Sequence, residues 1–345
     1  MTEIGFVMEP SPRTTATLAR RLEAMGFDLL LCPDTQNLSA DPYGQLSLAA
    51  AATTRLRLGT GVTNPVTRDA AVTASAMATL QLESGGRAVC GIGRGDSSAA
   101  HIGKRQASTA ELANYATTVA AYLARKTVPR GETASTIRWL AELQLPKVPI
   151  DIACTGPKTI AMAVDCADRI SFAVGSAPER LSWAMDQALK RLRESGRRRD
   201  SVKIGAYVNI VCHAERERAV QLARMGVGLV AHFTGMKHAP TEHLPPRLRT
   251  VAEQLKSGYD MQRHAQEHGR HLADIDDEFV RWFAIAGDPH YCRTRLKALI
   301  ELGLDHLYFI TGSPVAAPHA ARVTASVDLA ELAAREVLPA LRNVT

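Results

Sequence analysis

Two kinds of hydrophobic pattern alternate along the chain. Short runs of apolar and β-branched residues are typical of β-strands, whereas longer segments with apolar residues every three or four positions are typical of amphipathic helices. Most of the short runs are apolar at consecutive positions, as expected for strands buried on both faces of a parallel sheet. The pattern predicts strands at residues 4–8, 29–32, 56–60, 88–92, 149–154, 170–174, 204–212 and 307–311.

Helical segments separate the predicted strands. In the first of them, Leu18, Leu22 and Met25 share one face. Eight strands, each followed by a helix, in a chain of 345 residues favour an α/β fold of the (β/α)8 TIM-barrel type rather than an open doubly wound sheet. The same count predicts a single domain that comprises residues 1–345. We expect helices at residues 14–25, 45–53, 69–82, 109–123, 158–167, 179–193, 215–225, 291–302 and 328–341.

One interval is too long for a plain barrel. Residues 226–286 separate the seventh and eighth predicted strands and contain Pro240, Pro245 and Pro246. Loops of this length in compact domains are usually structured and functional. We therefore predict a helical insertion between strands 7 and 8 that lies over the mouth of the barrel.

Three histidines in this insertion raise the question of a metal. His264, His268 and His271 have the i, i+4 and i+3 spacing that could direct two imidazoles at one ion. Neither an HExxH motif nor an acidic ligand at a fixed spacing accompanies them. The pattern therefore favours a solvated polar helix face, and we predict no metal.

Composition and charge narrow the class of protein. With 46% hydrophobic and 22% charged residues, the chain is typical of a globular protein. The net charge of +6 is scattered, aromatic residues make up only 5%, and the dense basic run 197–199 follows a predicted helix, so nucleic-acid binding has no support. No apolar stretch reaches the roughly 18 to 20 residues that span a membrane, no signal-peptide pattern opens the chain, and the six cysteines show no CxxC spacing. We expect a cytoplasmic protein with buried thiols.

Carboxylates follow three of the predicted strands. In a (β/α)8 barrel the chemistry lies at the carboxyl ends of the strands, and Glu9, Asp34 and Asp96 fall there after strands one, two and four. A carboxyl group that loses water beside a bound substrate can exchange a proton with it. The alternative is that these acids only cap helices, as Asp96 before Ser97 and Ser98 would. Both interpretations stay open at this point.

Glycine-containing turns follow the fifth and sixth strands. Gly-Pro-Lys at 156–158 opens a helix, so free backbone N–H groups and the positive end of the helix dipole would face the barrel mouth. Gly-Ser at 175–176 offers a second concave set of N–H groups. Each turn alone could be an ordinary connection between a strand and a helix, but two such turns in consecutive loops favour a phosphate site. The glycine run at 91–95 lacks the GxGxxG spacing of a dinucleotide-binding loop.

Several motifs, taken in order, resemble a known family. They are RLGTGVTNP at 57–65, the segment 74–87 that ends in GGR, GIGRGD at 91–96, the segment 152–158 with AD at 167–168, AGDP at 286–289 and LGLD at 302–305. Together they resemble the bacterial luciferase-like superfamily, most of all its coenzyme F420-dependent branch. That branch holds methylenetetrahydromethanopterin reductase and the F420-dependent glucose-6-phosphate dehydrogenases. The resemblance covers nearly the whole chain.

The resemblance implies a barrel that binds coenzyme F420 or, alternatively, FMN, usually as a homodimer. Gly61 and Val62 match the family's non-prolyl cis peptide behind the cofactor ring, and segments 153–157 and 174–176 match those that hold the ribityl phosphate. The three acids named above fall where the family places acids around the reactive ring carbon. The cofactor-binding residues expected from the resemblance and from the glycine turns are Gly61, Val62, Thr63, Gly93, Arg94, Gly95, Ala153, Cys154, Thr155, Gly156, Pro157, Lys158, Val174, Gly175 and Ser176.

The sequence also departs from the family. The sugar-phosphate dehydrogenases place a histidine and then an aromatic residue after the acid of the second loop, whereas Thr35 and Gln36 follow Asp34 here. Their basic phosphate-binding residue would fall near Ala177, whose side chain cannot hold a phosphate. Glucose 6-phosphate is therefore not the expected substrate.

These observations lead to one main hypothesis and two alternatives. The main hypothesis is an oxidoreductase that transfers a hydride between reduced F420 and a small organic substrate or a pterin-like carrier. Glu9 or Asp96 would supply the proton, and Asp34 would orient the ring. The alternatives are an FMN-dependent monooxygenase of the same superfamily and a non-catalytic flavin-binding protein. Candidate partners for a polyglutamate tail, if they are not solvated surface charges, are Lys104, Arg105 and Lys158.

Overall fold

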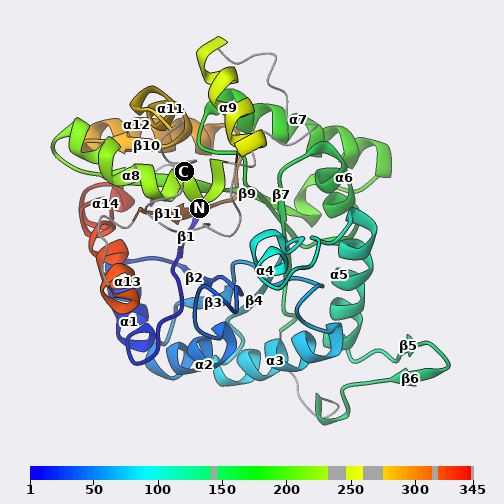
Figure 1. Cartoon of the computed structure of the whole chain (residues 1–345). Coiled ribbons are helices and arrows are strands. Elements are labelled where there is room, and N and C mark those ends of the chain that lie inside the picture. The colour runs from blue at the N-terminus through cyan, green and yellow to red at the C-terminus, as the bar shows by residue number, and fades with distance from the viewer. Residues whose placement is uncertain (141–145, 232–245, 259–274, 313–317, 343–345) are drawn as a thin grey trace.

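Eight parallel strands form a closed barrel in the computed structural model of the chain (Figure 1). The structure describes residues 1–140, 146–231, 246–258, 275–312 and 318–342. Pairing of the last strand with the first, and of β8 with β9, completes the ring. The predicted (β/α)8 barrel is confirmed, with strand ends that shift by a residue or two. Around the barrel the strands are β1 (Glu3–Val7), β2 (Leu29–Cys32), β3 (Arg57–Thr60), β4 (Ala88–Ile92), β7 (Ile150–Cys154), β8 (Arg169–Phe172), β9 (Lys203–Cys212) and β11 (His306–Ile310).

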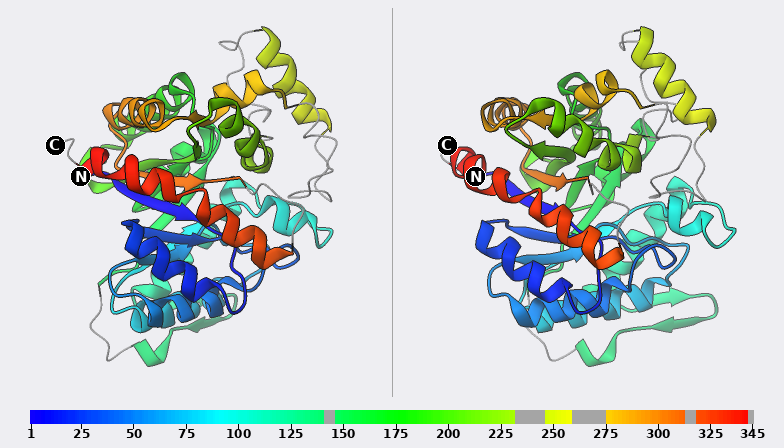
Figure 2. Two further views of the ribbon diagram at one scale, coloured as in Figure 1. Left: turned by 90° about the vertical axis from the view of Figure 1, so that its left-hand side faces the viewer. Right: turned by 60° about the vertical axis from the view of Figure 1, so that its left-hand side comes forward.

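Helices cover the outside of the barrel, as Figure 2 shows from two further directions. A large buried apolar cluster packs their inner faces against the outward side chains of the strands. Among the described helices, none combines the length and the hydropathy needed to cross a membrane. In the described part of the chain, seven helices precede β9, and a further helix directly precedes β11. They are α1 (Thr15–Met25), α2 (Pro42–Ala52), α3 (Ala70–Glu83), α4 (Asp96–Ala100), α5 (Thr109–Leu123), α6 (Pro157–Cys166) and α7 (Pro178–Ser195), and then α12 (Pro289–Glu301). The 3-10 turns η1 (Arg138–Leu140) and η2 (Arg199–Ser201) also precede β9.

Two regions differ from the prediction. In place of the single helix expected over 328–341, the structure has α13 (His319–Asp328), α14 (Glu331–Glu336) and α15 (Leu338–Arg342). Pro339 explains the last break, because proline has no N–H and its ring clashes with the preceding turn of a helix. In addition, a hairpin that the hydrophobic pattern did not indicate projects from the body of the molecule (Figure 1); its strands are β5 (Val128–Arg130) and β6 (Thr133–Ser135).

The interval between β9 and β11 is helical in its described parts. It holds α8 (Arg216–Val230), α9 (Pro246–Gly258), α11 (Asp277–Phe283) and the short strand β10 (Ile285–Gly287), which pairs with β9. The predicted histidine cluster at 264–271 lies outside the described residues. The insertion has a small apolar core of its own with α8, which includes Leu248, Val251, Leu255, Phe279 and Phe283.

A buried polar network closes the barrel at the amino ends of the strands. The Tyr308 hydroxyl donates to Asp151 Oδ2 over 2.6 Å and accepts from Arg169 Nη2 over 2.8 Å. Arg169 also donates to Glu3, and the Ser171 hydroxyl donates to the other oxygen of Asp151 over 2.7 Å. Arg169 is therefore a buried cation with carboxylate and hydroxyl partners.

Two rings fill the same end of the barrel. His306 and Tyr308 stack with their centroids 4.6 Å apart. Glycine is required opposite each ring: a Cβ on Gly5 would lie 2.7 Å from Tyr308 Cδ1, and a Cβ on Gly205 would lie 2.2 Å from His306 Cδ2. The amino end is therefore fully occupied by side chains.

The carboxyl end of the barrel has smaller residues on its inner side. Strand residues alternate between the helices and the barrel axis, and on the axis side Ala153 and Ala173 gather with Tyr207 and Ile310. Gly61 follows β3 with the same alternation, against Leu31 of the inner cluster. Gly61, Ala153 and Ala173 are thus small inner residues at the end of the barrel where (β/α)8 enzymes hold their active sites.

Candidate active site

The chain beyond β3 forms one wall of the barrel mouth. The Gly61 N–H donates to the Cys32 carbonyl over 2.8 Å, and the Thr63 N–H donates to the Gly91 carbonyl over 2.9 Å. The Gly93 N–H donates in turn to the Thr63 carbonyl over 2.8 Å. The bond between Gly61 and Val62 is cis. These bonds hold residues 61–63, called the β3 wall below, between the ends of β2 and β4.

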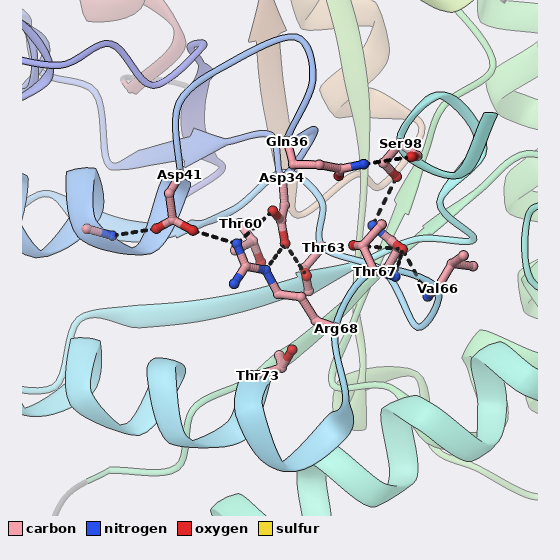
Figure 3. Close-up of polar contacts among 12 residues, drawn as sticks. Asp34, Gln36, Asp41, Thr60, Thr63, Val66, Thr67, Arg68, Thr73 and Ser98 are labelled. Carbon is pink, nitrogen blue, oxygen red and sulfur yellow. Dashed lines mark hydrogen bonds and ion pairs between the residues drawn. The ribbon is translucent and has the colours of Figure 1, made fainter. Parts of the chain in front are cut away.

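Asp34 supports the β3 wall (Figure 3). Its carboxylate is only 2% exposed and accepts from the Thr63 hydroxyl over 2.7 Å and from Arg68 Nε over 2.6 Å. Arg68 Nη2 lies 3.1 Å from the other oxygen of Asp34 and 2.6 Å from Asp41. Burial alone would lower the pKa of Arg68, but its bonds to Asp34 and Asp41 outweigh this and raise it. Asp34 is therefore an ion-paired acceptor that fixes the wall, with the Arg68 guanidinium stacked on the ring of Tyr43.

Arg68 is a site residue that sequence reasoning missed. It lies 34 positions after Asp34, and nothing in its local pattern distinguishes it from a surface arginine. Thr63 was expected to contact the cofactor, whereas its hydroxyl is used by Asp34. The pairing can be recognised only once β2 and β3 are placed side by side.

Glu9 projects from the end of β1 and has a partner that the sequence did not reveal. His319, the first residue of α13, donates from Nε2 to the Pro10 carbonyl over 3.1 Å. Its Nδ1 lies 3.4 Å from Glu9 Oε2, and the Glu9 side chain is 33% exposed. Nδ1 also lies 3.5 Å from Arg322 Nη2, so the imidazole stands between the Glu9 carboxylate and a guanidinium at the mouth.

The loop after β4 is tied to both neighbouring loops. Gln36 Nε2 donates to the Ser98 carbonyl over 2.9 Å, and Asn64 Nδ2 donates to the Ser98 hydroxyl over 3.0 Å (Figure 3). Gly95 is the N-cap of α4, so the half-buried Asp96 is its first helical residue and not a cap. Gly95 has a φ of +73°, and a Cβ there would lie 2.6 Å from the Asn64 side chain.

Arg94 does not reach freely into the mouth. Its Nε donates to the Ala107 carbonyl over 2.6 Å, and its own carbonyl accepts from the Ala107 N–H over 2.9 Å. The guanidinium therefore braces the loop after α4. Gly93 has a steric role, because a Cβ at this position would lie 2.5 Å from Val62 Cγ2.

The loop after β7 leaves open space at a helix start. Gly156 is the N-cap of α6 with no side-chain cap, and apart from its own chain neighbours no described residue lies within 4 Å of the Cβ that it lacks. Pro157 begins the helix, and Lys158 is exposed. Cys154 points the other way: its thiol lies 3.4 Å from the Ile152 carbonyl, and burial raises its pKa well above the ordinary value. An anion at this point would meet backbone N–H groups and not the thiol.

Packing explains much of the Gly-Ser motif after β8. Gly175 has a φ of +85°, and a Cβ there would lie 2.7 Å from the Phe283 ring. The Ser176 N–H donates to the Phe283 carbonyl over 2.7 Å, and the Ser176 carbonyl accepts from Arg295 Nη2 over 3.2 Å. Val174 is buried in the outer core. The nest expected at Gly175–Ser176 therefore lacks its Ser176 donor, which α11 already uses.

An unused donor lies across the mouth from the β3 wall. Asn209 lies on the axis side of β9, two positions beyond Tyr207, and β9 is four strands from β3 in either direction around the barrel. Its side chain is 2% exposed, and Nδ2 has no partner among the described residues. A buried amide without a partner costs about 1 to 3 kcal/mol, so Asn209 is available to a bound molecule.

Comparisons with known proteins agree with this geometry. The family model described as luciferase-like monooxygenase matches residues 3–306. A 5,10-methylenetetrahydromethanopterin reductase of Methanolobus tindarius is 26% identical over 317 residues, covering 90% of this chain and 94% of the relative.

Two solved structures share the fold. An F420-dependent secondary alcohol dehydrogenase in complex with an F420–acetone adduct aligns with a TM-score of 0.73 at 18% identity, over 99% of each chain. The oxygenating constituent of 3,6-diketocamphane monooxygenase from a plasmid of Pseudomonas putida, in complex with FMN, aligns with a TM-score of 0.66 at 16% identity, over 99% of this chain and 98% of that one.

Proposed function

The chain belongs to the luciferase-like monooxygenase family, and from that membership we propose that it is an oxidoreductase that transfers a hydride between coenzyme F420 and a small organic substrate. One observation carries the proposal: the barrel mouth has glycine and alanine on its inner side, next to a wall that belongs to the backbone of residues 61–63. A flat ring needs such a surface. The relative named as a methylenetetrahydromethanopterin reductase and the alcohol dehydrogenase structure named for F420 support the choice of cofactor.

The residues present fit the cofactor at both of its ends. The ring would lie against the β3 wall, within reach of Gly93, whose lack of a side chain keeps that side flat. The phosphate would lie at the start of α6, where Gly156 leaves open space before the free N–H groups of the first turn. Asp34 and Arg68 would keep the wall in place during turnover.

The chemistry divides between cofactor and protein. When bound in its reduced form, F420 would supply the hydride, and the protein would orient the cofactor and exclude water. Glu9 would hold the proton at Oε2, with His319 Nδ1 3.4 Å away as the group that restores it. Positioned acid–base groups contribute about 10² to 10⁴ in rate. Asp34 cannot take this role while Arg68 and Thr63 occupy its oxygens.

The substrate would lie on the side of the ring that faces β9. There Asn209 Nδ2 would donate to a carbonyl or similar acceptor on a small organic molecule or a pterin-like carrier. Ala177, at the start of α7, is buried and uncharged, so it cannot hold a sugar phosphate as the basic residue of the glucose-6-phosphate dehydrogenases would at this position. We further propose that the protein acts as a homodimer.

Binding and oxygen dependence test this function. Purified protein is titrated separately with F420 and FMN, and turnover is then followed without oxygen. Tight binding of F420 and anaerobic turnover would support the proposal, whereas oxygen uptake with reduced FMN would favour a monooxygenase. If the wild-type protein, which keeps Glu9, binds either cofactor but shows no turnover, a non-catalytic flavin-binding protein would be favoured.

A further inference from the structure

Arg180 is a buried cation that has no hydrogen-bond partner among the described residues. It is the third residue of α7, close after the carboxyl end of β8, and only 3% of it is exposed. Nε, Nη1 and Nη2 are all buried, and none has a hydrogen-bond partner in the described parts of the chain. The guanidinium lies 5.7 Å from the centroid of the Trp282 ring. The adjacent carboxylate, Glu179, is exposed and accepts from the Trp282 indole.

This state is costly for the ligand-free protein. A buried charge is tolerated when it is paired and hydrogen-bonded, and it is strongly unfavourable otherwise. Burial lowers the pKa of Arg180 to about 10, so the group still carries its proton at neutral pH. Arg169, also buried, has Glu3, Asp151 and Tyr308 as partners. Arg180 has the burial of a structural arginine without the acceptors of one.

The surroundings of Arg180 add positive potential. Arg295 contacts the same turn, since it donates to the Ser176 carbonyl as well as to the Tyr291 hydroxyl, and its Nε has no hydrogen-bond partner among the described residues. Arg180 also lies in the first turn of a helix of 18 residues, where the dipole favours a negative charge. The turn between β8 and α7 thus gathers cationic groups.

We propose that Arg180 binds an oxyanion, a phosphate or a carboxylate, carried by the molecule that occupies the barrel mouth. The guanidinium presents planar N–H donors that match either group in a bidentate manner. The anion belongs to the tail of the cofactor or to the substrate. Only the assignment to the cofactor rests on the function proposed above.

The first test measures stability without ligand. Arg180→Met removes the unpaired charge and keeps an unbranched apolar side chain, so its Tm should rise by a few degrees. Arg191→Gln is the matched control on the same helix: Arg191 is partly exposed and bound to Asp165 over 2.9 and 2.8 Å, and its loss should change the Tm little. A clear fall in the Tm of Arg180→Met would mean that the guanidinium has a structural partner, and would overturn the proposal.

The second test uses inorganic phosphate at constant ionic strength. The Tm of the wild type and of Arg191→Gln should rise with phosphate, and that of Arg180→Met should not. Arg180→Lys, which keeps the charge without the planar fork, should retain part of the response and so separates lost charge from lost packing. An equal response of wild type and Arg180→Met, or none in the wild type, would reject the site.

The third test locates the anion. The Kd of F420 and that of its nucleoside, which lacks the phosphate and the tail, are measured by fluorescence. If the cofactor supplies the anion, Arg180→Met should weaken F420 about 10- to 100-fold and leave the nucleoside unchanged. An unchanged Kd for both, with the phosphate response lost, assigns the anion to the substrate. If the wild type binds neither deazaflavin yet responds to phosphate, the proposed function fails and the assignment of Arg180 stands.

Discussion

The two ends of the barrel treat buried polar side chains in opposite ways. At the amino end, Asp151, Arg169 and Tyr308 satisfy one another in a closed network. Near the mouth, Arg180 and Asn209 are as deeply buried, but the Arg180 guanidinium and Asn209 Nδ2 have no hydrogen-bond partner among the described residues. The first arrangement stabilises the fold. The second destabilises the ligand-free protein, and a ligand that supplies the missing acceptor would remove this destabilisation.

One atom at the amino end needs a separate explanation. The Ser171 hydroxyl has one hydrogen, which it donates to Asp151, so it must accept from His306 Nε2 over 2.8 Å. His306 Nδ1 is then an acceptor with no hydrogen-bond partner in the described parts of the chain. Burial, followed by the charge of Arg169, lowers the pKa of His306 well below its ordinary value, which keeps the ring neutral. Every charged group of the network, namely Glu3, Asp151 and Arg169, therefore has a partner, and the unpaired atom belongs to a neutral ring.

The largest effect is expected when the amino-end network is broken. Asp151→Ala leaves the Tyr308 and Ser171 hydroxyls without their buried acceptor and takes one of its two carboxylate partners from Arg169, which should cost about 3 to 5 kcal/mol of unfolding free energy in urea. Asp165→Ala, which removes an exposed partner of Arg191, should cost less than about 1 kcal/mol. Equal losses in the two variants would contradict the stabilising role of the network.

A mouth residue should show the reverse behaviour. We expect Glu9→Gln to lower kcat by about 10² to 10⁴ through loss of the proton donor. The Tm and the Kd of F420 should not change, because Glu9 is partly exposed and its ion-pair partner among the described residues is a half-buried histidine. The Asp96→Asn variant is measured in parallel. A larger loss of kcat in that variant than in Glu9→Gln would identify Asp96 as the proton donor.

The pH dependence of stability should report the amino end. The unfolded state binds a proton on His306 below about pH 6.5 while the buried ring in the folded state does not, so the unfolded state gains protons and stability falls as the pH drops. Between pH 6.5 and 5 this should cost the wild type about 1.5 to 2 kcal/mol more than His306→Gln. Parallel profiles for the two proteins in urea would show that His306 becomes protonated without unfolding.

The smallest effect concerns Asn209. Asn209→Leu removes one donor without changing the shape of the side chain, so KM for the substrate should rise about 3- to 10-fold. The Tm should stay the same or rise, since no bond within the described chain is lost. A marked fall in Tm would place Asn209 with the structural network and weaken the contrast between the two ends.

The sequence was sufficient for the barrel because hydrophobic periodicity is a local property. Each of the eight barrel strands, and a helix after each of the first seven, follows from a run of a few residues, whereas the short strands β5, β6 and β10 do not. The terminal segment was misjudged where Pro339 interrupts an otherwise helical pattern. The spacing of apolar residues alone does not show such a break.

The site was only partly predictable because its contacts join distant segments. Asp34 and Glu9 stand out after their strands, but their partners Arg68 and His319 have no local signal. The Gly-Ser turn after β8 looked like an anion nest because the pattern does not reveal that Phe283 packs against it from α11. Arg180 looks like an ordinary residue of an amphipathic helix until its burial is known.

The two glycines opposite the rings at the amino end also set the stagger of the strands. Gly5 is in register with Tyr308, and Gly205 is in register with His306. If β11 slipped by two positions along β1, the Tyr308 ring would meet Glu3 or Val7, where a side chain already occupies the space. Because strand number and shear together determine the diameter of a barrel, these two positions without side chains fix how wide the opposite end can be.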